Sequence, residues 1–371
     1  MPLPGARNGK LLTIRGSKVD FSFWPVAKTT RRYGLTSRVY VNDAWPIIAE
    51  AIATRCPKKK RDAAQAFRFQ AEEYFRAANQ AQQTATKPLL FYYAFLNLVK
   101  AYLLTTTSHQ SLSHQTKHGL RERANLRQIV GSTVTAEPSD KARLSIFSLL
   151  LEAMGAKALP RERKYRLGNL LPQMVPGHRI WCDASKSKER FVRVKLSVFK
   201  NARRKRLWLA MYFDEDDSKR LGLSHVEMMR RAGLQGSWQV VASSSPLKIK
   251  LEQIEPTKYK HRPSDVLANV VKDLKPKIWS IVLSVSPYRA YYVYLCPKGE
   301  RRSVLPQLAS MYAVMFFLGS VTRYRPEQFE NILDSPYGAQ IENMLHEIPG
   351  QFLFLMASEF LNREVAKASI V

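Results

Sequence analysis

The sequence predicts an α+β protein in which N- and C-terminal helices pack together and a mainly antiparallel, β-rich middle region is inserted between them. Two observations lead to this fold class. Long apolar stretches with helical spacing occur towards both ends of the chain. Short runs of alternating apolar and polar residues occupy the middle. The change of pattern along the chain predicts four parts, of which the last packs on the second. They are an irregular basic arm at 1–40, an N-terminal helical part at 41–155, a basic β-rich middle at 156–300, and C-terminal helices at 301–371.

The N-terminal helical part contains two strongly patterned segments. Apolar residues recur at i, i+4, i+7, i+8 and i+11 from Phe67 to Ala78, which predicts an amphipathic helix. Pro88 suits the first turn of a second helix, and residues 88–104 are apolar nearly all round except for Asn97 and Lys100. We expect this second segment to be the central buried helix.

Residues 106–140 are rich in Ser, Thr, Gln and His, so they are predicted to be mainly loop, with one further helix at 141–154. Alternation resumes in the middle, where the strand patterns FVRVKLSVF and LWLAMYF flank the basic turn KNARRKR. The segment IWSIVLSVSPYRAYYVYL predicts a second hairpin that turns at Ser286 and Pro287. Helices are predicted again at 305–322, after Pro326, and at 340–362.

The charge of the chain points to a polyanionic partner. Lysine and arginine total 59 against 30 aspartate and glutamate residues, which leaves a formal net charge of +29. Self-repulsion of this size is typical of proteins that bind phosphates, because each docked cation releases condensed counterions. The composition therefore favours nucleic acid, with DNA and RNA both open, over an anionic membrane or an unspecialised basic surface.

Several classes of site are not expected. The three cysteines are widely spaced, which argues against a disulfide framework or a zinc knuckle. Standard phosphate-loop, dinucleotide, nucleophile-elbow and zinc-protease motifs are missing from the sequence, so neither a cofactor nor a metal is predicted. The longest uninterrupted apolar stretches are shorter than the roughly 20 residues that a membrane span needs. We therefore expect a cytoplasmic protein that does not associate with a membrane.

Three groups of cations are candidates for contacts with nucleic acid. The predicted hairpin turn should project its basic side chains into solvent, and one face of the preceding strand combines Arg193 and Lys195 with the rings of Phe191 and Phe199. Such a face could serve as a single-strand platform, or its rings could pack under a neighbouring element. The remaining candidates are the tract Lys58, Lys59, Lys60 and Arg61 and the turn residues Arg203, Arg204, Lys205 and Arg206.

Catalytic candidates are weaker. Arg220 and His225 have the R-x4-H spacing of HEPN-type ribonucleases, in which histidine moves the proton and arginine steadies the phosphate charge. The alternative is structural, because His225 follows Ser224 at the start of a capped helix. The acidic run from Asp214 to Asp217 is interpreted as a solvated turn before a helix, since four adjacent carboxylates cannot all face one ion.

Two segments carry a family resemblance. The segment KPLLFYYAFLNLVKAYLL at 87–104, with KHGL at 117–120, and the segment FFLGSVTRYRPEQF at 316–329 resemble the YaaC-like family of largely uncharacterised bacterial proteins. The resemblance implies helices that flank a β region and brings no settled activity. It singles out Asn97, Lys100, His118, Gly119, Ser320, Arg323, Tyr324 and Pro326.

These motif residues suggest a polar cleft. Asn97 and Lys100 interrupt an apolar helix, and a lysine buried without a partner costs several kcal/mol. We expect Lys100 to share an anion-binding cleft with His118 and Arg323; a hydrogen-bond network that joins the terminal helices is the alternative. The expected cleft residues are Asn97, Lys100, His118, Ser320, Arg323, Tyr324 and Arg325.

The sequence thus favours a nucleic-acid-binding bacterial protein, as a component of a system that acts on foreign DNA or RNA. One alternative is a metal-independent HEPN-like ribonuclease that uses His118 or His225 with a neighbouring arginine. Another is a non-catalytic subunit whose charge serves an acidic protein partner. The sequence leaves open whether a protein partner or a second copy of the chain also binds.

Overall fold

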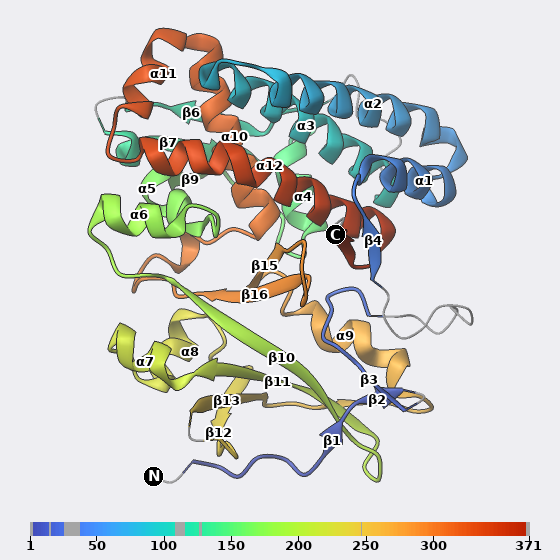
Figure 1. Cartoon of the computed structure of the whole chain (residues 1–371). Coiled ribbons are helices and arrows are strands. Elements are labelled where there is room, and N and C mark those ends of the chain that lie inside the picture. Colours follow the sequence, from blue (N-terminus) through green and yellow to red (C-terminus); the bar gives the residue numbers. More distant parts are fainter. Residues whose placement is uncertain are drawn as a thin grey trace. The chain divides into compact units, whose positions relative to one another are not determined.

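The computed structural model describes residues 3–14, 16–25, 38–107, 116–125, 128–245 and 247–368 (Figure 1). The chain forms two compact units, each built from segments that are distant in sequence. The helical unit comprises residues 41–189 and 302–361. The sheet unit comprises residues 1–40, 190–301 and 362–371.

In the helical unit, helices from both ends of the chain surround one central helix, α3 (Lys87–Thr106). The side chains of α3 are buried almost all round, because α2, α10 and α12 pack against it. Phe95 of α3 stacks on Phe352 of α12 with ring centroids 3.8 Å apart. The predicted packing of terminal helices is therefore confirmed. The surrounding helices are α1 (Trp45–Arg55), α2 (Lys58–Gln80), α10 (Gln307–Tyr324), α11 (Pro326–Leu333) and α12 (Gly338–Leu361).

Close approach of the backbones fixes the contact between α3 and α10. A Cβ atom added at Gly319 would lie 3.0 Å from the Cβ of Tyr92 and 3.1 Å from the carbonyl oxygen of Pro88, so a larger residue there would require the two helices to shift by a few tenths of an ångström. By length and composition alone, the helical span Thr84–Thr106 could cross a membrane, although 72% of its most apolar window is buried inside the fold.

The segment after α3 contains more regular structure than the sequence predicts. The interpretation of 106–140 as mainly loop is wrong for β6 (Leu120–Arg123) and β7 (Thr133–Ala136). Together with β9 (Arg163–Arg166) they form an antiparallel sheet in the order β6-β7-β9. Each strand has only four residues and one polar face, so its composition looks like that of a loop. The other elements here are β5 (Thr116–Lys117), β8 (Leu144–Ser145), α4 (Ile146–Ala153), α5 (Leu167–Leu170) and α6 (His178–Ser185).

The sheet unit is built on an antiparallel sheet in the order β12-β13-β11-β10-β16-β15, with β1 on β10 and β14 on β11. The two predicted strand pairs are confirmed as β10 with β11 and β15 with β16. The strands are β1 (Lys10–Leu11), β10 (Phe191–Asn201), β11 (Arg206–Asp214), β12 (Trp238–Val241), β13 (Lys248–Gln253), β14 (Thr257–Lys258), β15 (Ile278–Val282) and β16 (Arg289–Tyr294).

The core of the sheet unit lies between this sheet and the short helices α7 (Glu215–Leu221), α8 (His225–Arg231) and α9 (Leu267–Lys272). Aromatic residues of the N-terminal segment join the same core, where Phe21 and Phe23 pack edge-on against Tyr291. A buried ionic group also belongs to this unit. Glu364, before β17 (Val365–Lys367), accepts from Arg38 at 2.6 Å and lies 3.9 Å from the Nε of Arg289. The fold is therefore mixed α+β with a central antiparallel sheet, as predicted.

Candidate nucleic-acid interface

The short sheet of the helical unit presents an ordered array of polar side chains on one face. The antiparallel register pairs Arg123 of β6 with Thr133 of β7, and Thr133 in turn with Arg166 of β9. Directly paired residues lie on the same face, and so do residues two positions apart along a strand. The second row of the array is therefore Arg121, Thr135 and Lys164. Two threonines are flanked on both sides by cations.

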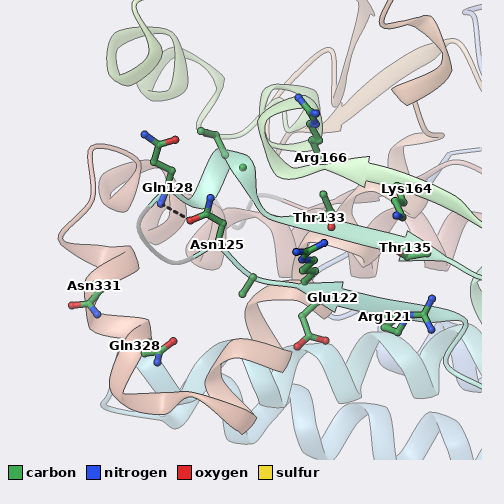
Figure 2. A pocket seen from close by; sticks show the side chains of 14 residues that line it. Arg121, Glu122, Asn125, Gln128, Thr133, Thr135, Lys164, Arg166, Gln328 and Asn331 are labelled. Carbon is green, nitrogen blue, oxygen red and sulfur yellow. Dashed lines mark hydrogen bonds between the residues drawn. The ribbon is translucent and has the colours of Figure 1, made fainter.

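This array lines a hollow of the helical unit with a volume of about 1570 Å³ (Figure 2). We call it the sheet-face hollow. Helix α11 contributes carboxamides along one edge, and two residues that follow β6 in the sequence contribute two more. None of the 14 lining residues is aromatic. The carboxamides belong to Asn125, Gln128, Gln328 and Asn331.

The electrostatics of the sheet-face hollow are unbalanced. Its one carboxylate, Glu122, pairs with Arg325 at 3.2 Å, and Arg121 lies near Glu137 and Glu162. By contrast, Arg123, Lys164 and Arg166 are exposed and have no carboxylate within 4.0 Å in the described part of the chain. Three like charges on one small face repel one another, so an anion bound between them is favoured.

The opposite face of the short sheet explains why the cations must face the hollow. Leu120, Val134, Ala136 and Tyr165 alternate with the polar positions and are buried in the helical unit. Side chains of a strand point alternately to its two faces, so burial of these residues directs Arg121, Arg123, Lys164 and Arg166 to the opposite face. The sequence analysis missed this site. The alternation within LRER, TVTA and RKYR was the available signal, but the register that joins them is set only by tertiary packing.

The sheet unit carries a second basic hollow, of about 780 Å³, at the turn between β10 and β11. We call it the hairpin hollow. The predicted turn residues Arg203, Arg204 and Lys205 are exposed, whereas Arg206 is half-buried. None of the hollow's lining residues is acidic. Its cations are Arg7, Lys10, Lys200, Arg203, Arg204 and Arg206.

Local geometry holds the N-terminal segment against this hairpin. Gly9 lies against the ring of Trp208, and an added Cβ would meet that ring at 2.1 Å. Arg7 donates hydrogen bonds to the carbonyl oxygens of Gln253 and Ile254, so this cation is occupied. Trp208 is 1% exposed, which removes its ring from contact with any ligand. The hairpin hollow therefore offers charge and no aromatic ring for stacking.

On the β10 face that was predicted as a single-strand platform, the cations are exposed but the aromatic rings are covered. Arg193 and Lys195 are exposed on β10, but Phe191 is 4% exposed and packs against Trp279 and Tyr294. The other ring of this face, Phe199, stacks on Trp208. The rings therefore take the alternative that the sequence left open, packing under neighbouring elements.

The basic tract at the start of α2 divides into two pairs. Lys58 and Lys59 are exposed. Lys60 is buried and its Nζ donates to the carbonyl oxygen of Thr107 at 2.7 Å, while Arg61 donates to the carbonyl oxygen of Cys56. Only the first two side chains have the exposure that a phosphate contact needs.

The R-x4-H candidates take part in ion pairs of short helices. Arg220 donates to Asp217 at 2.8 Å within α7, and His225 lies 3.2 Å from Glu215. Ser224 caps α8 by accepting from the backbone of Glu227, as the capping-box pattern predicts. Within the described residues, no three histidine, cysteine or acidic side chains form a group that could hold a metal ion.

The family-motif residues of the helical unit come together from three segments. The hydroxyl of Tyr92 is hydrogen bonded to Nδ1 of His118, and the guanidinium of Arg323 donates to the hydroxyl of Tyr93 at 2.6 Å. Burial lowers the pKa of the His118 imidazole, and the nearby charges of Lys100 and Arg323 lower this pKa further. We call Lys100, His118 and Arg323 the motif cluster.

Lys100 lies among apolar groups without a carboxylate partner in the described residues. Its Nζ lies 5.0 Å from the centroid of the Phe67 ring, and burial lowers the pKa of its ammonium group. Two other expected cleft residues, Asn97 and Ser320, are buried, whereas Tyr324 is 63% exposed. Arg325 is directed to Glu122 at the edge of the sheet-face hollow. The charges of Lys100 and of Arg323 thus each act on His118, whereas Arg325 pairs with Glu122; a cleft shared by Lys100, His118 and Arg323 stays a prediction.

The fold and the comparison with protein families together assign the chain to a family. A helical unit whose terminal helices enclose α3, and an antiparallel sheet unit that is inserted between them in the sequence, define a mixed α+β protein with two basic hollows. The profile of the YaaC-like protein family matches residues 26–360, and the chain belongs to this family. No curated protein and no solved structure matches it.

Proposed function

We propose that this protein binds nucleic acid and that the sheet-face hollow is where it contacts the sugar–phosphate backbone. The observation that carries this proposal is the set of unpaired cations Arg123, Lys164 and Arg166 around Thr133. Neighbouring strands are about 4.8 Å apart, so Arg123 and Arg166 stand about 10 Å apart across β7. Both guanidinium groups can reach one phosphate above the threonine row, and arginine suits such bidentate contacts.

The expected contribution of these cations can be bounded. Each phosphate neutralised on a duplex changes the slope of log K against log salt by about 0.9, so three contacts account for a slope of about −2.7. The hairpin hollow supports the same function, because its exposed cations Arg203 and Arg204 have no acidic neighbour among its lining residues. An acidic protein partner would give a weaker salt dependence, since it does not release a condensed counterion layer.

A metal-independent ribonuclease is the second candidate function, and the motif cluster favours it. The imidazole of His118 is held by Tyr92 beside the cations Lys100 and Arg323. A lowered pKa keeps this imidazole neutral at pH 7, as a general base requires. Cleavage of RNA in the presence of a chelator, lost on His118→Asn, would support this second candidate.

The test of nucleic-acid binding compares two triple variants with the same charge loss. The hollow variant replaces Arg123, Lys164 and Arg166 by serine. The control replaces Arg143, Lys157 and Arg161, which are exposed on the same unit and do not line the hollow. We expect the hollow variant to bind a labelled oligonucleotide about tenfold or more weakly than the control does, because bound phosphates lose their specific partners. Equal binding by the two variants would remove the hollow from the proposed function.

A further inference from the structure

The sheet-face hollow has neutral groups in addition to the cations that phosphates need. Threonine hydroxyls form its central row, and carboxamides line its edges. Such groups form hydrogen bonds with other neutral groups, and each can donate as well as accept. The ligand should therefore present hydrogen-bond donors beside its phosphates.

One acceptor atom of the hollow, in the side chain of Gln328, calls for such a hydrogen-bond donor. It lies on α11 at the edge of the hollow, and its Oε1 is buried without a hydrogen-bond partner in the described part of the chain. An unsatisfied buried acceptor costs on the order of 1–3 kcal/mol. Phosphate oxygens only accept hydrogen bonds, so a phosphate cannot satisfy this oxygen. A hydroxyl or amino donor on the ligand can.

The lining also indicates which part of a nucleic acid supplies the donor. Proteins that hold single strands by their bases use aromatic rings as stacking platforms, and none of the 14 lining residues is aromatic. Contacts should therefore fall on the sugar and phosphate. Among sugars, ribose has the 2′-hydroxyl, which is both a donor and an acceptor, and deoxyribose lacks it.

We propose that the sheet-face hollow selects RNA over DNA, with its free cations on phosphates and the Oε1 of Gln328 accepting a hydrogen bond from a ribose 2′-hydroxyl. This inference rests on the proposed function, because it names the class of nucleic acid that occupies the same site. Thr133, between Arg123 and Arg166, provides a further hydroxyl for the sugar next to the clamped phosphate.

The test uses two probes that differ in the 2′-hydroxyl alone, an RNA strand and a deoxyuridine-containing DNA strand of the same sequence. Their dissociation constants are measured at one salt concentration with the full chain. We expect RNA to bind about three- to tenfold more tightly, the effect of roughly one net hydrogen bond. Gln328→Met, which keeps the side-chain length and helix propensity, should abolish most of this preference for RNA.

The outcomes separate the two proposals. Equal affinity of the natural chain for both probes would overturn the selection of RNA and leave nucleic-acid binding in place. Failure to bind either probe would end both proposals. A preference that persists undiminished in a folded Gln328→Met variant would exclude Gln328 as the selecting group. Because the probes themselves carry the change, the comparison on the natural chain holds even where a variant fails to fold.

Discussion

The guanidinium of Arg323 donates a hydrogen bond to the hydroxyl of Tyr93 at 2.6 Å, although 230 residues separate them in the sequence. This bond joins the two long segments that carry the family resemblance. The neighbouring Tyr92 joins the third segment through His118. The charges of Lys100 and Arg323 both lower the pKa of His118, and a common anion cleft of the three residues stays a prediction. Within the described residues no carboxylate pairs with Lys100 or Arg323, and the bonds of Tyr92 and Tyr93 match the alternative of a hydrogen-bond network that joins the terminal helices.

The lowered pKa of His118 leads to the first prediction. Burial comes first among its causes, and the charges of Lys100 and Arg323 add to it. The folded pKa lies below the unfolded value of 6.5, so the unfolded chain binds more protons in that interval. The contribution of His118 to stability should therefore fall as the pH drops below 6.5. NMR titration of the imidazole should show this lowered pKa, and Lys100→Met should raise it.

An anion provides the control for this titration. Inorganic phosphate or an oligonucleotide bound at the motif cluster would offset the charges of Lys100 and Arg323, so the pKa of His118 should rise on binding. His118→Asn assigns the signal. A pKa at or above 6.5 in the free protein would contradict the electrostatic account of this cluster.

The second prediction concerns the backbone beside His118. Gly119 has φ +79°, and an added Cβ would lie 2.0 Å from Oγ of Ser145. Gly119→Ala should therefore combine the cost of a left-handed alanine with a steric clash. Gly155 is a matched control, since it has φ +81° and open space around it. We expect the free energy of unfolding in urea to drop at least ~1 kcal/mol more for Gly119→Ala than for Gly155→Ala. If both variants lose the same free energy of unfolding, the clash with Ser145 is relieved at little cost.

The sequence predicted the fold where local patterns were long. The apolar spacing of α2 and α3 and the alternation of β10 and β11 each extend over many residues, and each follows from burial of one face or of all faces. The basic turn between β10 and β11 was likewise visible, because a polar run between two apolar strands has to be exposed.

The sheet-face hollow could not be predicted in the same way. Arg123, Thr133 and Arg166 come from three four-residue strands, and their alignment depends on the register between those strands. Burial of Leu120, Val134 and Tyr165 against the helical core sets that register. A sequence read one segment at a time contains the charges but not the pairing that collects them on one face.

The third prediction tests the buried ionic group of the sheet unit. Glu364 is 2% exposed, accepts from Arg38, and lies beside Arg289 and Tyr291. Glu364→Gln removes the negative charge and leaves a buried cation without compensation, which should cost about 3–5 kcal/mol. Glu300→Gln serves as the control, because Glu300 pairs with Arg190 at 3.6 Å near the surface and should contribute ~1 kcal/mol or less. If chemical denaturation shows a similar loss of unfolding free energy for both variants, the buried ionic group does not stabilise the sheet unit more than a surface ion pair does.

The fourth prediction concerns the hairpin hollow. Arg203 and Arg204 are exposed in the turn, and Arg206 begins β11 as a half-buried residue that lines the same hollow. Lys205 should be kept, since its Nζ donates to the carbonyl oxygen of Lys260 and its backbone has φ +48°. Serine at the three arginines should leave the melting temperature nearly unchanged, because two of them are exposed, Arg206 is only half-buried, and surface cations outside ion pairs contribute little to stability.

Binding should respond differently from stability in this variant. The three arginines act on phosphates by charge, so their loss should weaken binding about tenfold and reduce the slope of log K against log salt by about 2–3, equally for unrelated sequences. Serine at Lys219, Lys272 and Lys298, exposed cations of the same unit outside the hollow, removes the same charge and tests for a general effect of net charge. Titrations of a labelled oligonucleotide at several salt concentrations give both quantities. If the control weakens binding as much as the hairpin variant does, the hairpin hollow contributes only to the overall field of the protein, and specific phosphate contacts lie elsewhere.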